Sequence, residues 1–230
     1  MKILVACEES QRVCTAFREK GHEAYSCDII DCSGGHPEWH IKQNVIPLLN
    51  GNCEFETCDS ELHTVSDRWD MIIAFPPCTY LTNCATRHFS LRCTSAEKVV
   101  LRWENRALAA VFFMRFALAD CDRIAVENPV GFMSKAFRKP DQIIEPYYFA
   151  KSENDFENYN TKRTCLWLKG LPMLQRVNDL TRPKLEKYIT KNGKVKSICW
   201  EMKNHGSNVR SKTFPGIAKA MAEQWGIEEA

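Results

Sequence analysis

A cysteine and a glutamate each follow a short apolar run and have proline close by. Cys78 comes after the run 71–74 and two prolines, and Glu127 comes directly after the run 124–126, with Asn128 behind it. Apolar runs that stop at proline are typical of buried strands. Ligands of open α/β sheets bind at the carboxyl ends of the strands. The sequence therefore predicts a thiol and a carboxyl group at the functional edge of one sheet.

A thiolate and a carboxyl group together suit addition to a pyrimidine ring. The C5 carbon of a pyrimidine is a poor nucleophile, and covalent addition of the Cys78 thiolate to C6 gives C5 the character of an enamine carbon. A protonated Glu127 that donates to N3 stabilises the charge that develops on the ring. The alternatives are a structural cysteine, since free cysteines are mostly small buried hydrophobes, and a solvated surface glutamate.

The first 28 residues predict a strand, a helix and a second strand with an acid at its end. The strand 2–7 leads into the helix 11–20, and the strand 23–27 ends at Asp28. A carboxylate in that place binds the two hydroxyls of a ribose, although a solvated loop aspartate is an equal alternative. No glycine-rich phosphate loop follows the first strand, which disfavours a pyrophosphate cofactor. S-adenosylmethionine, which has a ribose but no phosphate, is the expected cofactor.

Further elements are expected to position these groups. They are a loop-rich stretch with a hairpin near Asn50-Gly51 in 31–68, a polar lid over 79–95, a long helix over 96–118, a strand over 164–168 and a helix over 213–225. The long helix carries apolar residues at core spacing, namely Val99, Val100, Trp103, Leu108, Val111, Phe112 and Phe116.

Composition bounds the class of protein. The chain has 230 residues, 44% of them hydrophobic, and a net charge of +2, which indicates one globular domain that is not strongly basic. No apolar run is long enough to span a membrane and no signal peptide is expected. We therefore expect a cytoplasmic protein whose twelve cysteines are free. Cys53, Cys58 and His63 lack a fourth ligand nearby, so no metal site is expected.

The order and content of these residues resemble the DNA (cytosine-C5) methyltransferases, and in closer detail the short proteins of that kind encoded by phages and prophages. The matching stretches are Phe75-Pro76-Pro77-Cys78 with the preceding Asp70, Glu127-Asn128-Pro129, Thr161-Lys162-Arg163-Thr164 with the strand after it, and Asn208-Val209 with the helix up to Trp225. The chain departs from the family at residues 6–10, which replace a Phe-x-Gly-x-Gly loop. It departs also at Thr79, where the family has Gln, and at Pro129, where it has Val.

The resemblance implies an α/β fold of the S-adenosylmethionine-dependent methyltransferase type, a mainly parallel sheet with helices on both faces. It implies a catalytic domain over 1–170 with 206–230, and a short insert over 171–205 as a reduced target-recognition region. The implied activity is methylation of cytosine C5 in DNA, with the target base flipped out of the duplex. The alternatives are modification of another pyrimidine, in RNA or a free nucleotide, and a catalytically idle nucleic-acid-binding protein.

The resemblance also assigns roles to individual residues. The implied catalytic residues are Cys78, Glu127, Asn128, which supports the loop, and Arg163, which orients the base or the thiolate. The implied cofactor-binding residues are Ala6, Cys7, Glu8, Asp28, Asp70, Phe75 and Pro76.

Overall fold

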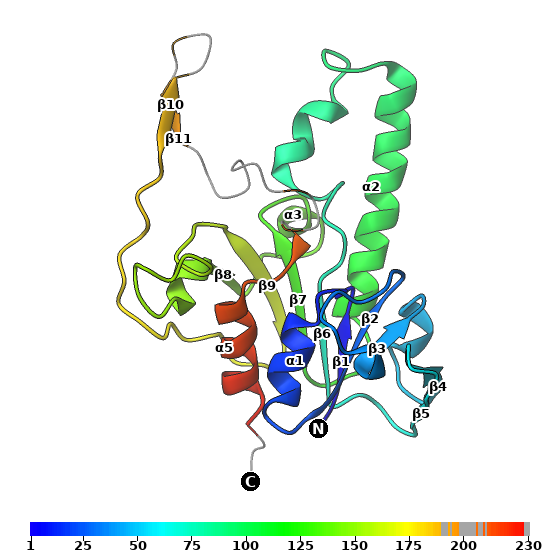
Figure 1. Ribbon diagram of the computed structural model, residues 1–230. Helices are drawn as coiled ribbons and strands as arrows, with labels where there is room; N and C mark the ends of the chain where they lie inside the picture. The colour runs from blue at the N-terminus through cyan, green and yellow to red at the C-terminus, as the bar shows by residue number, and fades with distance from the viewer. Residues whose placement is uncertain (190–192, 194, 198–205, 207–208, 210, 228–230) are drawn as a thin grey trace.

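The protein is built on a seven-stranded sheet in the order β3-β2-β1-β6-β7-β9-β8. The computed structural model describes residues 1–189, 193, 195–197, 206, 209 and 211–227 (Figure 1). The strands are β1 (Lys2–Ala6), β2 (Glu23–Asp28), β3 (His40–Lys42), β6 (Met71–Ala74), β7 (Ile124–Pro129), β8 (Gln142–Ile144) and β9 (Thr164–Lys169). The first five strands of this order run parallel, and β9 is antiparallel to both β7 and β8. The predicted α/β class with a mainly parallel sheet is confirmed.

The central strands are apolar along their whole length because both faces of the sheet are covered. In β1 and β6 the pairs Leu4↔Ile72 and Val5↔Ile73 stand side by side in parallel register, and all four side chains are fully buried. Continuous apolar runs of this kind are typical of parallel strands with helices on both sides. The runs that predicted these strands are therefore explained by the layers above and below them.

Helices α1 (Arg12–Arg18) and α5 (Pro215–Trp225) cover one face of the sheet (Figure 1). Phe17 of α1 and Met221 of α5 are fully buried in the same apolar cluster as Val5. Trp225 closes this layer, and its indole Nε1 donates to the carbonyl of Pro172 at 2.9 Å.

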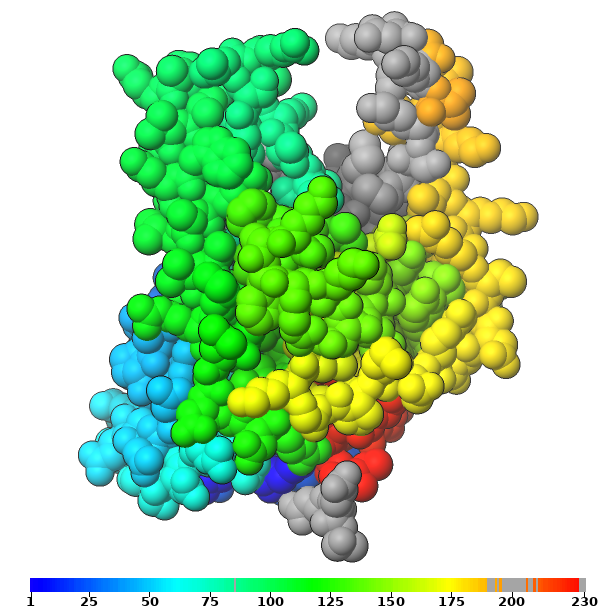
Figure 2. Space-filling model, turned by 180° about the vertical axis from the view of Figure 1, so that it is seen from behind, coloured from blue at the N-terminus to red at the C-terminus, as the bar shows by residue number. Residues whose placement is uncertain are grey.

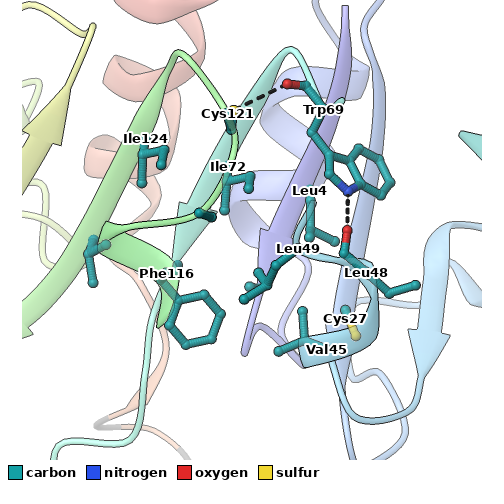
Figure 3. Close-up of a cluster of buried hydrophobic side chains, with 14 of the residues drawn as sticks. Leu4, Cys27, Val45, Leu48, Leu49, Trp69, Ile72, Phe116, Cys121 and Ile124 are labelled. Carbon is teal, nitrogen blue, oxygen red and sulfur yellow. Dashed lines mark hydrogen bonds between the residues drawn. The ribbon is translucent and has the colours of Figure 1, made fainter. Parts of the chain in front are cut away.

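Helix α2 (Ala96–Ala117) and the chain around Trp69 cover the other face. Figure 3 shows Phe116 beside Ile72 and Ile124, with Trp69 at the far side of the cluster. The Trp69 indole donates to the Leu48 carbonyl at 2.7 Å, and the Cys121 thiol donates to the Trp69 carbonyl at 3.2 Å. Buried cysteines such as this one act as small apolar residues, and the cysteines of the described part of the chain are free thiols, as expected.

The long helix forms where it was predicted, but most of the apolar face predicted for it is exposed. Phe116 packs in the core, while Val100 and Leu108 are 57% and 69% exposed. Val100 is exposed because the amino-terminal half of α2 extends beyond the edge of the sheet (Figure 1). The predicted lid 79–95 is not a plain loop, because it contains the 3-10 helix η3 (Asn83–Phe89), which packs against α2.

The hairpin of the 31–68 stretch is β4 (Cys53–Glu56) with β5 (Leu62–Val65), so the Asn50-Gly51 turn precedes it and does not connect its strands. Gly51 has a φ of 66° and lies against the backbone of residue 67, where a Cβ would collide. Within β5, the two ring nitrogens of His63 contact the hydroxyls of Tyr25 and Thr57. Among the described residues no cluster of His, Cys, Asp and Glu has the makings of a metal site.

The region after residue 170 belongs in part to the main domain. Leu174 is buried in the core, and Asn178 donates to the carbonyls of Tyr147 and Ala150. These contacts attach residues 174–178 to the sheet domain, beyond the boundary predicted at 170. The part of this region that stands away is the hairpin of β10 (Lys187–Ile189) and β11 (Val195–Ser197).

Short elements complete the described chain. They are η1 (Pro37–Trp39), η2 (Ile46–Leu48), α3 (Met133–Ala136) and η4 (Pro146–Phe149). Within the described ranges, no helix combines the length and the apolar character that crossing a membrane requires.

Candidate active site

Cys78 and Glu127 lie at the ends of neighbouring strands. Glu127 belongs to the end of β7, and Cys78 follows the end of β6, its neighbour in the sheet. Asn128 joins the two ends, because its Nδ2 donates to the carbonyl of Pro76 at 2.8 Å and its side chain is 1% exposed. This hydrogen bond is the contact through which Asn128 can support the loop, the role predicted for it. It holds the loop that carries the thiol against the strand that carries the carboxyl group.

This edge of the sheet is where the order of the strands reverses. From β1 the chain proceeds to β2 and β3 on one side, and then returns to place β6 on the other side. Open α/β sheets bind ligands in the crevice that such a reversal leaves at the carboxyl ends. Phe75 extends β6 along β1, with its N–H donating to the carbonyl of Ala6 at 2.9 Å. The structure therefore places Phe75, Pro76 and Ala6, three predicted cofactor residues, beside this crevice.

Charge and burial act in opposite directions on the Cys78 thiol. The residue is exposed as a whole, but protein atoms crowd the sulfur, and this desolvation raises its pKa. The negative charge of Glu127 raises the pKa further, and the ammonium of Lys162 lowers it. The backbone fixes the position of the residue, since its carbonyl accepts from Leu81 at 2.9 Å and from Thr82 at 3.0 Å.

The carboxyl group of Glu127 takes up a proton more readily than an ordinary glutamate. Burial raises its pKa, while Lys162 and a hydrogen bond with Thr164 lower it, and the net direction is upward. A half-buried carboxyl group with a raised pKa is suited to donate a hydrogen bond or a proton.

The basic residue beside this pair is Lys162 and not Arg163, which corrects the prediction. Lys162 acts on the pKa of both Cys78 and Glu127. Arg163 is exposed, and its charge acts on Cys165, a different thiol. Neighbouring residues of an extended segment point to opposite faces. Thr164, which bonds Glu127, therefore shares its face with Lys162, and this alternation was readable in the sequence.

Asp28 lies where the sequence predicted it, at the end of β2 next to β1. It is half-buried, and its Oδ1 accepts from the N–H groups of Ile29 at 2.7 Å and Ile30 at 3.4 Å. These two isoleucines are 73% and 54% exposed. A carboxylate for ribose hydroxyls, next to apolar side chains for a purine ring, fits the adenosine part of S-adenosylmethionine.

Two other residues predicted to bind the cofactor have different roles. Glu8 is 4% exposed, and its two carboxylate oxygens accept from the N–H groups of Val13 at 2.7 Å and Cys14 at 3.1 Å. It therefore caps α1, and burial raises its pKa to about 7. Asp70 accepts from the Lys2 N–H at 2.6 Å at the amino end of β6, because it precedes that strand. It lies at the edge of the sheet opposite the crevice.

The turn after β1 replaces glycine with a strained cysteine. Cys7 has a φ of 58°, in the left-handed region that favours glycine. Burial raises the pKa of its thiol, so Cys7 contributes shape and backbone groups to the crevice. Of the closing motif, Asn208 lies outside the described residues, and Val209 is exposed.

Two arms rise beyond the carboxyl edge of the sheet. One is α2 with η3, and the other is the β10–β11 hairpin (Figure 1). Figure 2 shows the green arm of α2 rising above the body of the molecule. The stretch 79–106 of the first arm has five Lys and Arg residues and two Glu residues. This arm is therefore more basic than the nearly neutral chain as a whole.

Comparison with known proteins adds no relative: no protein-family model and no curated protein matches this chain. The functional argument therefore depends on the site itself.

Proposed function

We propose that this protein transfers a methyl group from S-adenosylmethionine to C5 of cytosine in DNA, with Cys78 as the nucleophile. The observation that carries the proposal is the hydrogen bond from Asn128 to the Pro76 carbonyl. That contact fixes a thiol and a proton-donating carboxyl group side by side at the ligand-binding edge of an α/β sheet. The same constellation carries the resemblance to the DNA (cytosine-C5) methyltransferases.

The charges of the site couple the thiol to the carboxyl group. The negative charge of Glu127 raises the pKa of Cys78, which burial already raises, and Lys162 lowers the pKa of both groups. A proton on Glu127 therefore removes a negative charge that opposes ionisation of Cys78. The proposed reactive state has a neutral Glu127 beside the Cys78 thiolate, which is the form that attacks carbon.

In the proposed reaction, the sulfur of Cys78 adds to C6 of the cytosine ring and breaks the C5–C6 double bond. Glu127 donates its proton at N3, which accepts the electron density that addition moves into the ring. Bound S-adenosylmethionine supplies an electrophilic methyl group, and Asp28 with Ile29 and Ile30 would hold its adenosine part. Transfer of the methyl group leaves S-adenosylhomocysteine. The C5 proton then leaves to water, the double bond re-forms, N3 returns its proton to Glu127, and Cys78 is released as the thiolate.

The arms of the molecule support a nucleic-acid substrate. A base inside a duplex cannot reach a thiol at a strand end, so the target base has to be flipped out. The basic arm of α2 rises beyond the same edge of the sheet (Figure 1), and its positive charges are suited to phosphate groups.

The test is a covalent adduct with DNA that contains 5-fluorocytosine, in the presence of S-adenosylmethionine. Fluorine at C5 cannot leave as a proton, so the bond from Cys78 to C6 persists and a shifted band appears on a denaturing gel. Cys78→Ser should abolish the band. Cys84→Ser removes another exposed thiol, in η3, and should retain the band.

Three outcomes of this test contradict the proposal or redirect it. Absence of the band with a folded protein that binds DNA refutes the covalent mechanism. A band with 5-fluorocytosine RNA or with the free nucleotide, and none with DNA, assigns the other pyrimidine substrate. Failure to bind S-adenosylmethionine identifies an idle nucleic-acid-binding protein.

A further inference from the structure

A cavity of about 270 Å³ lies between η3 and the amino-terminal half of α2. Lys98, Arg102 and Asn105 line it from α2, and His88 and Thr94 line it from the preceding segment. Tyr80, two residues after Cys78, forms part of the same wall. The cavity therefore adjoins the loop of the proposed nucleophile without containing Cys78 or Glu127.

The positive charges around this cavity form no ion pair with a carboxylate of the described residues. In the described part of the chain, none of the ion pairs involves Lys98, Arg102 or Arg106. The Nε of Arg102 is buried and has no hydrogen-bond partner in the described structure. Arg106 is 7% exposed, and its pKa is lowered by burial and by the charge of Arg102. A buried charge without a counter-ion is costly.

Aromatic rings hold the two guanidinium groups in place. The Cζ atom of Arg106 lies 3.4 Å from the ring centre of Phe89, and that of Arg102 lies 5.0 Å from the same ring. Tyr80 also faces Arg102, at 5.1 Å. Contacts with ring faces stabilise a cation in part, and they leave the buried Nε of Arg102 without a hydrogen-bond partner among the described residues. The site is therefore arranged in advance for a negative ligand.

We infer that this cavity binds one phosphodiester group of the nucleic-acid substrate, with Lys98 and Arg102 as its principal ligands. This inference rests on the proposed function, since it identifies where the backbone of the substrate is held. A guanidinium fork matches the oxygens of a phosphate, and an ammonium adds a mobile positive charge. A volume of about 270 Å³ lies just below the usual range for sites of small-molecule ligands, which suits a group the size of a phosphate.

The same arginines contact the loop that carries the nucleophile. Arg102 donates from Nη2 to the carbonyl of Thr79 at 3.4 Å, and Arg106 donates from Nε to the carbonyl of Tyr80 at 2.9 Å. A phosphate bound by Arg102 is thus fixed relative to the chain directly after Cys78. Phosphate contacts set the register of a protein on nucleic acid, and here they would set the distance from backbone to thiol.

The experiment measures binding of a fluorescein-labelled duplex to the full chain by anisotropy, over a range of salt concentrations. Arg102→Gln and Lys98→Gln should each weaken binding about five- to tenfold, and each should reduce the salt slope by about one. Lys98 is exposed, so its replacement tests the site without disturbing the core. The control is Arg115→Gln, an exposed arginine near the other end of α2, which should leave affinity and slope unchanged.

Inorganic phosphate is the second probe, because the cavity also offers a place to a free anion. The assignment is supported if phosphate competes with the duplex for the wild-type protein and does not compete for Lys98→Gln. Unchanged duplex affinity and salt slope in both cavity variants would overturn it, even if phosphate binds, since the site would then hold an adventitious ion only.

The 5-fluorocytosine adduct, measured at saturating DNA, separates this inference from the proposed function. Weakened binding in the cavity variants with an adduct in the wild type supports both. Weakened binding without any adduct keeps the phosphate site and refutes the cysteine chemistry. An adduct with unchanged binding in the variants keeps the chemistry and refutes the phosphate site.

Discussion

Lys162 sets the charge balance of the site at the scale of single residues. Its ammonium lowers the pKa of both Cys78 and Glu127, against the effect of burial on each. Lys162 therefore offsets part of the increase that burial and Glu127 cause in the pKa of the Cys78 thiol. The adjacent Arg163 has no such effect on Cys78, because its charge acts on the buried Cys165.

Replacement of Lys162 should make the Cys78 thiol harder to ionise. Without the nearby positive charge, the pKa of Cys78 rises, so the midpoint of its alkylation by iodoacetamide against pH should move upward in Lys162→Gln. Mass spectrometry of the peptide that contains Cys78 measures the rate at each pH. Arg163→Gln is the matched control and should leave that midpoint unchanged. A shift in the Arg163 variant alone would restore the role that the sequence assigned to Arg163.

The sequence predicted the residues of the site that depend on local context. Cys78, Glu127 and Asn128 were found because proline and apolar runs mark strand ends. Glu8 and Asp70 were predicted to bind the cofactor, but the end of a helix or strand that each of them meets in space could not be read from local context. The N–H groups of α1 satisfy Glu8, and the amino end of β1 satisfies Asp70.

At the scale of elements, helix α1 depends on the carboxylate of Glu8. This helix has no side-chain cap from its own N-cap residue, Gln11. Glu8 reaches across the turn after β1 and accepts from two of the first N–H groups of the helix. A carboxylate at a helix amino end is favourable, but complete burial of the group raises its pKa to about 7.

The stability of the fold should therefore depend on the protonation of Glu8. The pKa of this group is 4.5 in the unfolded chain and about 7 in the folded one, so the unfolded chain gives up its proton first. The stabilising contribution is complete below pH 4.5 and is lost as the pH rises through 7. The loss is at most about 3 kcal/mol, from 1.36 kcal/mol for each pKa unit.

Urea unfolding at pH 5 and pH 8 measures this contribution as a difference between proteins. Glu8→Gln cannot ionise, so its loss of stability between the two pH values should be smaller than that of the wild type. Glu19→Gln, an exposed glutamate just after the same helix, should follow the wild type. Equal pH dependence in all three proteins would show that Glu8 ionises in the folded state as it does in the unfolded chain.

Helix α2 shows which element properties the sequence determines. Its bounds were predicted within a residue, because helical propensity and periodicity are local. Its buried face was not, because burial depends on which part of the helix meets the sheet. The amino-terminal half extends beyond the sheet, so that Val100 remains exposed. In the carboxyl-terminal half Phe113 and Phe116 are buried, while Leu108 and Val111 of the same half are exposed. The extended half supplies the basic cavity next to η3.

At the scale of the whole molecule, the functional edge is assembled from distant parts of the chain. The predicted alternation of strands and helices indicated the α/β class. The reversal of strand order at β1 and β6 depends on pairing between segments that are far apart in the sequence, so local patterns did not predict it. The antiparallel entry of β9 beside β7 is also non-local, and it brings Lys162 and Thr164 to Glu127. Sequence periodicity carries no information on which strands become neighbours, so Lys162 was missed.

Replacement of Asp28 tests the proposed cofactor site, because Asp28 ends β2 beside the crevice at β1. Asp28→Ala should weaken S-adenosylmethionine binding by about 1–3 kcal/mol, the range for a hydrogen bond to a charged group, and isothermal titration calorimetry measures it. Because a ligand that binds the folded state stabilises the whole molecule by mass action, the rise in melting temperature with cofactor should fall in parallel. Asp31→Ala is the control, because Asp31 is exposed and pairs with Lys42 at 2.8 Å in the same loop. Unchanged affinity in the Asp28 variant, with cofactor still bound, would move the adenosine site away from β2 and leave the exposed Ile29 and Ile30 without their proposed ligand.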